Sequence, residues 1–295
     1  MTFCDPPGCG CCNRSFEYIE SDKFLLPGAA RNIALDLVET KYVVYCDNDV
    51  TYFPQWLESL YRNAEKNGSA AVAPVTLIGP SEPKRIHHAG GILKLVKDGN
   101  GRQMLRGRHR LGNTDLPDAE NSGFHSISCE HDYFEYHCVL AKTEAMRAIG
   151  GHDERLTIFE HLDCSLRLKA AGNKITFEPS AKIMYTAFKR FIDEDWPYFL
   201  YRWSKKRAMN SSKIFSENWG INQSNSFASI HQQRAMMTVL PRLPKFLNHA
   251  RIKQGLLLLF IPRILSFDPG IPDDPAAKAL DRPPLDSLKA AGIQE

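Results

Sequence analysis

The chain has 295 residues, of which 43% are hydrophobic, enough to bury a sizeable core in one large domain or in a domain with appendages. Its 37 Lys and Arg residues against 34 Asp and Glu give a formal net charge of +3, too near balance to indicate a nucleic-acid partner. A basic-then-apolar export signal is absent at the start, and no apolar run reaches the ~18 residues of a membrane span. We therefore expect a cytoplasmic protein that does not cross a membrane.

The eight cysteines fall into two groups. Four of them crowd into the first 12 residues, where Cys9 and Cys12 form one Cys-x-x-Cys, but no second Cys or His pair follows at the spacing of a zinc site. We expect residues 1–15 to be a disordered leader. The later cysteines lie in apolar or helical contexts and are expected to be reduced core residues: Cys46, Cys129, Cys138 and Cys164.

The first elements predict a strand-helix-strand unit. Phe16 to Glu20 alternates like a short strand, Gly28 to Val38 has helical periodicity, and Tyr42 to Val50 begins as a run of β-branched and aromatic residues. The small residues that open the helix allow close approach of a neighbour or a ligand, and Arg31 could reach a phosphate. Packing of the helix on the sheet explains the small residues equally well.

Two carboxylates, Asp47 and Asp49, follow the apolar strand. In open α/β sheets ligands bind in the crevice outside the carboxyl ends of the strands, so this is where chemistry is expected. Hard carboxylate oxygens suit a divalent cation that carries a phosphorylated ligand. The alternative is a solvated turn, because Asp-Asn-Asp favours turns anywhere.

The middle of the chain continues with alternating elements. A helix is expected over Gln55 to Lys66, ended by a glycine, and a short strand over Ala70 to Pro74. The stretch from Ile86 to Val96 is strand-like, and the turn sequence from Asp98 to Gly101 predicts a hairpin. The long polar stretch from Arg102 to Gly123 is expected to be an irregular loop and a candidate lid.

A second acidic region follows a buried strand over His137 to Ala141 and a helix over Thr143 to Ile149. Asp153 lies in the turn after that helix, and Glu160 and Asp163 are neighbours on one face of a helix that begins near Thr157. The acids could be catalytic. A structural role explains them as well, because acids in a helix's first turn are favoured by its dipole.

The order of these pieces is more specific than any one of them. It comprises the Gly28 to Asn32 helix start, Asp47-Asn48-Asp49, the Gly150 to Glu154 turn, Glu160-His161-Leu162-Asp163 through Arg167, and Gly172 with Glu178-Pro179. The ordered series, over about residues 16–205, resembles the family 2 glycosyltransferases of GT-A fold.

The resemblance implies an α/β fold of the GT-A-like nucleotide-diphospho-sugar transferase type, with a mixed sheet flanked by helices. It also implies inverting transfer of a sugar from a nucleotide-diphosphate sugar to a glycan or lipid-linked acceptor. Mg²⁺ or Mn²⁺ would bind at Asp47 and Asp49, and Arg31 would bind the donor with them. Glu160 is the first choice for the base, with Asp163 and Asp153 behind it.

Two residues and one missing segment depart from the family pattern. His161 stands where the family usually has the aspartate of Glu-Asp, and Tyr185 stands where a metal-binding His often follows the next strand. The family's opening strand-helix-strand, which holds the nucleotide base, has no counterpart before Phe16. The alternative function is therefore a truncated, non-catalytic domain that binds sugar or a partner.

The remaining residues divide into two expected segments. After the catalytic domain over residues 16–205, a helical extension is expected over 206–267 and a disordered tail over 268–295. Within the extension, Gly255 to Pro262 is apolar and flanked by basic residues. It could lie on the inner face of a membrane or pack on the catalytic domain.

Overall fold

The computed structural model describes residues 17–79, 84–123, 129–186, 194, 196–202, 204–223, 277–280 and 287–293. The expected leader and the apolar Gly255 to Pro262 segment lie outside these residues.

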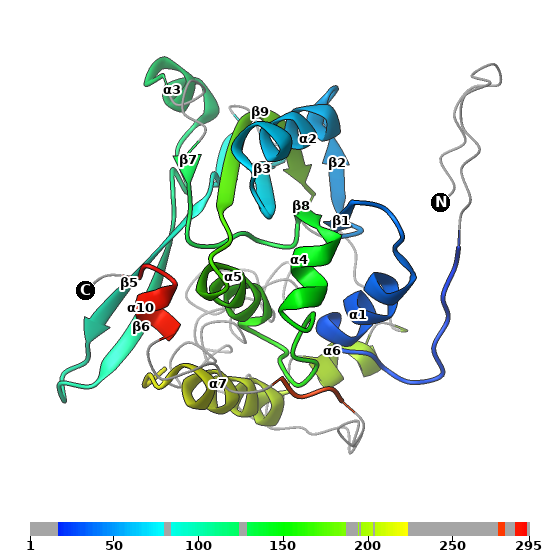
Figure 1. Ribbon diagram of the computed structural model, residues 1–295, viewed down its shortest axis with the longest axis vertical. Coiled ribbons are helices and arrows are strands. Elements are labelled where there is room, and N and C mark those ends of the chain that lie inside the picture. Colours follow the sequence, from blue (N-terminus) through cyan, green and yellow to red (C-terminus); the bar gives the residue numbers. More distant parts are fainter. Residues whose placement is uncertain are drawn as a thin grey trace, which may run out of the picture.

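The helices and strands alternate along most of the chain (Figure 1). In order they are α1 (Pro27–Leu37), β1 (Tyr42–Cys46), β2 (Val50–Tyr52), α2 (Trp56–Asn67), β3 (Ala71–Ile78), β4 (Arg85–His88), β5 (Gly91–Lys97), β6 (Gln103–His109), α3 (Leu116–Asn121), β7 (Cys129–Glu130), β8 (Cys138–Lys142), α4 (Thr143–Ala148), α5 (Glu160–Ala170), β9 (Ile175–Tyr185), α6 (Trp196–Arg202), α7 (Lys205–Trp219) and α10 (Ser287–Ala290).

One mixed sheet forms the centre, with the strand order β1-β8-β3-β9-β2 and with β4 and β7 paired to β3 and β9. The β3–β9 pair is parallel, and the other pairs in this sheet are antiparallel. The expected α/β fold with a mixed sheet flanked by helices is confirmed. Antiparallel pairing of β8 with β1 has a consequence for the site, because it brings the start of β8 beside the end of β1.

The two faces of this sheet are covered by different helices. In β1 the side chains of Val43 and Tyr45 join a core cluster with residues of α1, α4 and α5, whereas Tyr42 and Val44 pack against the cluster that contains Leu60 of α2. Successive strand residues point to opposite faces, so a strand buried on both sides reads as a continuous apolar run. Figure 1 shows α2 on one side of the sheet and α4 and α5 on the other.

A second core lies beyond α5. Leu93 of the β5–β6 hairpin, Phe159 and Leu166 at α5, and Phe215 of α7 are buried in one cluster, and Leu288 of α10 belongs to it. The disordered tail expected over residues 268–295 therefore does not extend to α10. Burial of an apolar turn against α5 stabilises its position, and composition alone did not reveal that contact.

Two other expectations differ from the structure. Residues 17–20 are exposed and form no strand, because no neighbouring strand pairs with them in the described chain. The expected irregular loop from Arg102 to Gly123 contains β6 and α3. Strand β6 pairs with β5 along its whole length, from Gln103 to His109, although Leu105 is its one fully buried side chain.

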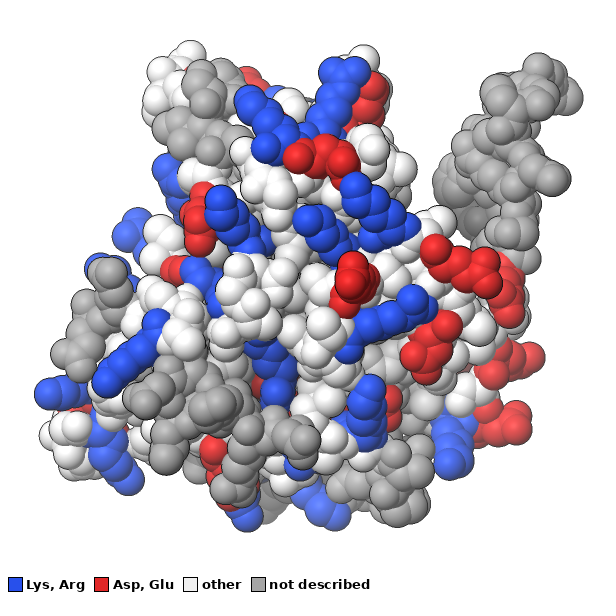
Figure 2. Space-filling model, viewed as in Figure 1, with Lys and Arg blue, Asp and Glu red and all other residues white. Residues whose placement is uncertain are grey.

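The described surface is mixed in charge. Figure 2 shows Lys and Arg interspersed with Asp and Glu over the face in view, with acidic side chains gathered near α1. This mixture agrees with the net charge of +3. None of the helices in the described part of the chain has the length and apolar character needed to cross a membrane.

Candidate functional site

The turn between β1 and β2 carries Asp47 and Asp49. Antiparallel pairing with β8 places His137 beside it, where the Asp47 amide donates a hydrogen bond to the His137 carbonyl at 3.3 Å. The side chains also meet, with His137 Nδ1 3.0 Å from Asp47 Oδ2. Ligand atoms of Asp47, Asp49 and His137 lie within 4.8 Å of one another, so these residues could hold a metal ion.

Asp49 has the features of a cation ligand. Its Oδ1 atom is buried and accepts no hydrogen bond from the described residues. Burial raises the pKa of Asp49, as does the charge of Asp47, whereas His137 and Arg202 of α6 lower it. Because an unpaired buried carboxylate oxygen is costly, a divalent cation at this position would stabilise it.

Arg31 approaches the same turn from α1. Its guanidinium lies over the ring of Tyr136, 3.6 Å from the centroid, and its Nη2 is 3.6 Å from Asp47 Oδ1. Nη1 is buried and donates no hydrogen bond to the residues that the structure describes. Stacking on an aromatic ring orients an arginine, and a free N–H of a guanidinium suits a phosphate oxygen.

The start of α1 is held by the Gly150 to Glu154 turn. Asn32 donates from Nδ2 to the His152 carbonyl at 2.9 Å and accepts from the His152 amide at 2.8 Å. A Cβ on Gly151, whose φ is +77°, would lie 2.5 Å from the Asn32 amide oxygen, and a Cβ on Gly28 would lie 3.1 Å from the Asp153 carbonyl. The small residues that open α1 therefore serve packing, and this packing positions Arg31.

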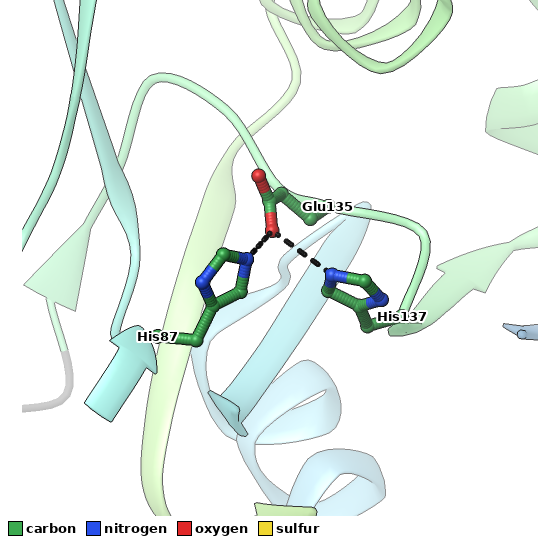
Figure 3. A group of neighbouring side chains, drawn as sticks. All are labelled: His87, Glu135 and His137. Atoms are coloured by element: carbon green, nitrogen blue, oxygen red, sulfur yellow. Dashed lines mark ion pairs between the residues drawn. The ribbon is translucent and has the colours of Figure 1, made fainter. Parts of the chain in front are cut away.

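Three histidines surround one carboxylate next to the turn, and we call His87, His109, Glu135 and His137 the His–Glu cluster. Glu135 Oε2 lies 3.1 Å from His87 Nε2 and 3.5 Å from His137 Nε2 (Figure 3). Glu135 Oε1 lies 2.9 Å from His109 Nε2. Burial would raise the pKa of Glu135, but His109 and His87 lower it well below its usual value. Burial would lower the pKa of His137, but Asp47 and Glu135 raise it.

The acids expected from the second motif have different surroundings. Asp163 is buried and accepts hydrogen bonds from Arg167 Nε at 2.8 Å and from Trp219 Nε1 at 2.9 Å. Burial raises the pKa of Asp163, and these two donors lower it. Asp153 is buried and ion-paired with Arg155. Glu160 is half-buried, and no described residue forms a hydrogen bond or ion pair with it.

The two residues that depart from the family pattern both lie at the site. Tyr185, at the end of β9, packs against His137 with 4.4 Å between ring centroids. His137, from the loop before β8, therefore lies next to Tyr185, where the family pattern led us to look for a histidine. His161 is beside Tyr133, and burial lowers its pKa, with His109 and Arg31 acting in the same direction and Glu160 and Glu135 opposing.

The sequence did not single out the His–Glu cluster. Glu135 and His137 directly precede a buried strand, a position that local patterns assign to an ordinary loop. Their proximity to Asp47 depends on the pairing of β1 with β8, across 90 positions of sequence.

Comparisons with known proteins agree with the resemblance. Residues 13–129 match the family model described as glycosyl transferase family 2. The pre-mycofactocin glycosyltransferases of two Mycobacterium tuberculosis strains, CDC 1551 / Oshkosh and H37Rv, are each 29% identical over 161 residues, which are 54% of this chain and 30% of theirs. This chain thus spans less than a third of the length of those relatives.

A crystal structure of GalNAc-T7 with UDP, GalNAc and Mn²⁺ is also similar, at 15% identity and a TM-score of 0.46, over 68% of this chain and 36% of that one. The family match includes Arg31, Asp47 and Asp49 and ends before Glu135. Over residues 13–129, this chain is similar to glycosyl transferase family 2.

Proposed function

We propose that this protein transfers a sugar from a nucleotide-diphosphate sugar to a hydroxyl group of a glycan or lipid-linked acceptor, with inversion at the anomeric carbon. The observation that carries the proposal concerns two residues beside Asp47. Asp49 has a buried oxygen, and Arg31 has a buried N–H group, that form no hydrogen bond with the described residues. The first suits a divalent cation and the second suits a phosphate, which are the two parts of a metal-bound diphosphate.

Each donor-side residue then has a distinct role. Asp49 and Asp47 would hold Mg²⁺ or Mn²⁺, which when bound would offset the negative charge on the leaving diphosphate. Arg31 donates to a phosphate oxygen and is kept in place by Tyr136 and by Asp47. Arg202 of α6, which lies close enough to Asp49 to lower its pKa, adds positive charge on the same side.

On the acceptor side, Glu160 takes the proton. The acceptor oxygen forms a bond to the anomeric carbon as the bond from that carbon to the diphosphate breaks, and the hydroxyl proton passes to the Glu160 carboxylate. The absence of a described partner leaves this carboxylate able to accept it. Asp163 and Asp153 are bound to Arg167 and Arg155, so we place them behind Glu160 in this role.

The test is nucleotide binding measured by calorimetry, with UDP, GDP and dTDP as probes, with and without Mn²⁺. Asp49→Asn is expected to abolish the gain in affinity that Mn²⁺ gives, since the amide is a weaker cation ligand and its shape is unchanged. The matched control is Asp36→Asn, which changes an exposed acid on α1. Equal Mn²⁺ dependence in wild type and Asp49→Asn would overturn the metal assignment.

A further inference from the structure

The His–Glu cluster contains a second group of atoms that could hold a metal ion. His87 comes from β4, and Glu135 and His137 come from the loop before β8, and one ligand atom from each of the three lies within 4.8 Å of the other two. Figure 3 shows one oxygen of Glu135 facing both imidazole rings. The side chains of His87, Glu135 and His137 are 26%, 17% and 18% exposed, so an ion could enter from solvent.

The two separations from Glu135 Oε2 to the imidazole nitrogens are compatible with a tetrahedral zinc ion. With zinc–ligand bonds of about 2.0–2.2 Å, neighbouring ligand atoms are about 3.4 Å apart. Here Glu135 Oε2 is 3.1 Å from one imidazole nitrogen and 3.5 Å from the other.

The hydrogen bonding also favours a metal over a simple ion pair. Although two ring nitrogens approach Glu135 Oε2, this atom is buried and accepts no hydrogen bond of acceptable geometry from the described residues. If ring N–H groups pointed at Glu135 Oε2, they would donate hydrogen bonds to it. If instead the nitrogen and oxygen lone pairs point at a common position, Oε2 accepts no hydrogen bond, as is observed. A bound cation would supply the missing partner.

The surrounding groups hold the ligands in the orientation that a metal requires. His137 presents Nδ1 to Asp47 Oδ2 at 3.0 Å, which leaves Nε2 for a metal, the carboxylate–histidine–metal arrangement common at zinc sites. His109 Nε2 lies 2.9 Å from Glu135 Oε1, so His109 contacts the carboxylate oxygen that the metal would not use. His109 Nδ1 is in turn 3.2 Å from the His87 carbonyl oxygen.

We propose that His87, Glu135 and His137 form a binding site for a zinc-type transition metal, which lies beside the Asp47/Asp49 cation site and uses the Nε2 atom of the shared His137. Two imidazoles and one carboxylate favour Zn²⁺ or Co²⁺ over Mg²⁺, which prefers oxygen ligands. Three protein ligands leave a fourth tetrahedral position for water, as in catalytic zinc sites. The inference does not depend on the proposed function.

The experiment measures binding of Zn²⁺ and Co²⁺ to the full chain after treatment with a chelator. The wild type is expected to bind Zn²⁺ and to give the intense visible absorption of tetrahedral Co²⁺. His87→Asn and Glu135→Gln should each weaken Zn²⁺ binding by about 100-fold or more, since loss of a direct ligand exceeds the ~10–100-fold effect of an outer partner. Two variants that remove carboxylates elsewhere, Glu130→Gln and Asp49→Asn, should keep the cobalt spectrum.

Circular dichroism and thermal unfolding establish that each variant is folded before it is scored. If His87→Asn does not fold, Glu135→Gln decides the result, because it changes charge and not volume. Unchanged Zn²⁺ affinity in the folded variants, or a wild-type Co²⁺ spectrum typical of octahedral oxygen ligands, would overturn the proposal. Binding of UDP with Mn²⁺ is measured in the same samples, and loss of that binding alone would count against the proposed function and leave the zinc site standing.

Discussion

Glu160 and Asp163 lie three positions apart at the start of α5, yet their surroundings suit them to different tasks. Asp163 is 2% exposed and is held by Arg167 and Trp219, which connects α5 to α7. Glu160 is half-buried and lies next to His161, whose pKa is affected by Glu135 and Arg31. The start of α5 is therefore within electrostatic reach of the His–Glu cluster, whereas Asp163 is bound to Trp219 of α7.

Glu160→Gln is expected to lower kcat by about 100-fold or more and to leave nucleotide-sugar binding unchanged, because the amide keeps the shape but cannot take the proton. The measurement is turnover and donor affinity on the same preparation, once a donor and an acceptor are known. A Glu160→Gln enzyme with wild-type kcat would show that another group is the base.

Asp163→Asn is expected to act mainly on stability. Removing one partner of a buried ion pair typically costs about 3–5 kcal/mol, because the remaining charge is left buried and uncompensated. Denaturant unfolding of Asp163→Asn measures the loss, with Asp36→Asn as the exposed control. Near-wild-type stability combined with a large loss of kcat would instead assign Asp163 a catalytic role.

At the scale of elements, antiparallel pairing organises the site. Strand β8 runs against β1, so His137 at its start meets Asp47 at the end of β1. Strand β2 pairs with the end of β9, so Tyr185 lies beside the same turn. In a parallel arrangement the start of β8 would lie beside the start of β1, at the other end of the strands from Asp47.

The short helix α10 gives a test of the second core. Leu288 is 6% exposed and packs in the cluster formed with α5, α7 and the hairpin. Leu288→Ala is expected to lower the free energy of unfolding by about 2–4 kcal/mol through lost burial and the cavity that remains. The control is Leu37→Ala on α1, where the leucine is 53% exposed, and an equal effect of both changes would contradict the packing of α10.

At the scale of the whole molecule, the described part of the chain has core clusters on both faces of the sheet and a further cluster between α5, α7, α10 and the hairpin. A buried polar network joins α1 to the cluster that it shares with α4 and α5. His152 is 1% exposed, with Nδ1 3.1 Å from the Asn32 amide oxygen and Nε2 against the Tyr136 hydroxyl. A neutral ring satisfies both contacts, donating to Asn32 and accepting from Tyr136.

This network predicts a loss of stability in acid. Burial lowers the pKa of His152 to about 3, with Arg31 and Lys278 acting in the same direction. The unfolded chain takes up a proton near its ordinary pKa of about 6.5, so the stabilisation is complete above that pH and is lost as pH falls toward 3, by up to about 1.4 kcal/mol per pH unit.

Denaturant unfolding between pH 7.5 and 4.5 measures this effect, with both values chosen to bracket the unfolded-state pKa of about 6.5. His152→Gln should be less stable than wild type at neutral pH, and the difference should shrink in acid because Gln takes up no proton. A difference that stays constant across this range would contradict a neutral His152.

The local pattern of the sequence determined most elements and one half of the candidate site. Helical period and a terminal glycine predicted α2, and a continuous apolar run before two acids predicted β1 and its turn. Arg31, Asp47 and Asp49 could be named in this way because each lies on an element that its neighbours in sequence specify. The Asp98 to Gly101 turn likewise predicted a hairpin after β5, although its second strand, β6, lies in a stretch that was expected to be an irregular loop.

Only the tertiary structure decided which side chains meet at the site. His87, Glu135 and His137 come together because β4 and β8 both pair with β3, and such pairings depend on packing between distant segments rather than on any local period. The same reason separates Glu160 from Asp163, since the contact of Asp163 with Trp219 spans 56 positions. Sequence determined where the carboxylates and imidazoles lie along the chain, and the long-range pairing of strands and helices determined their partners.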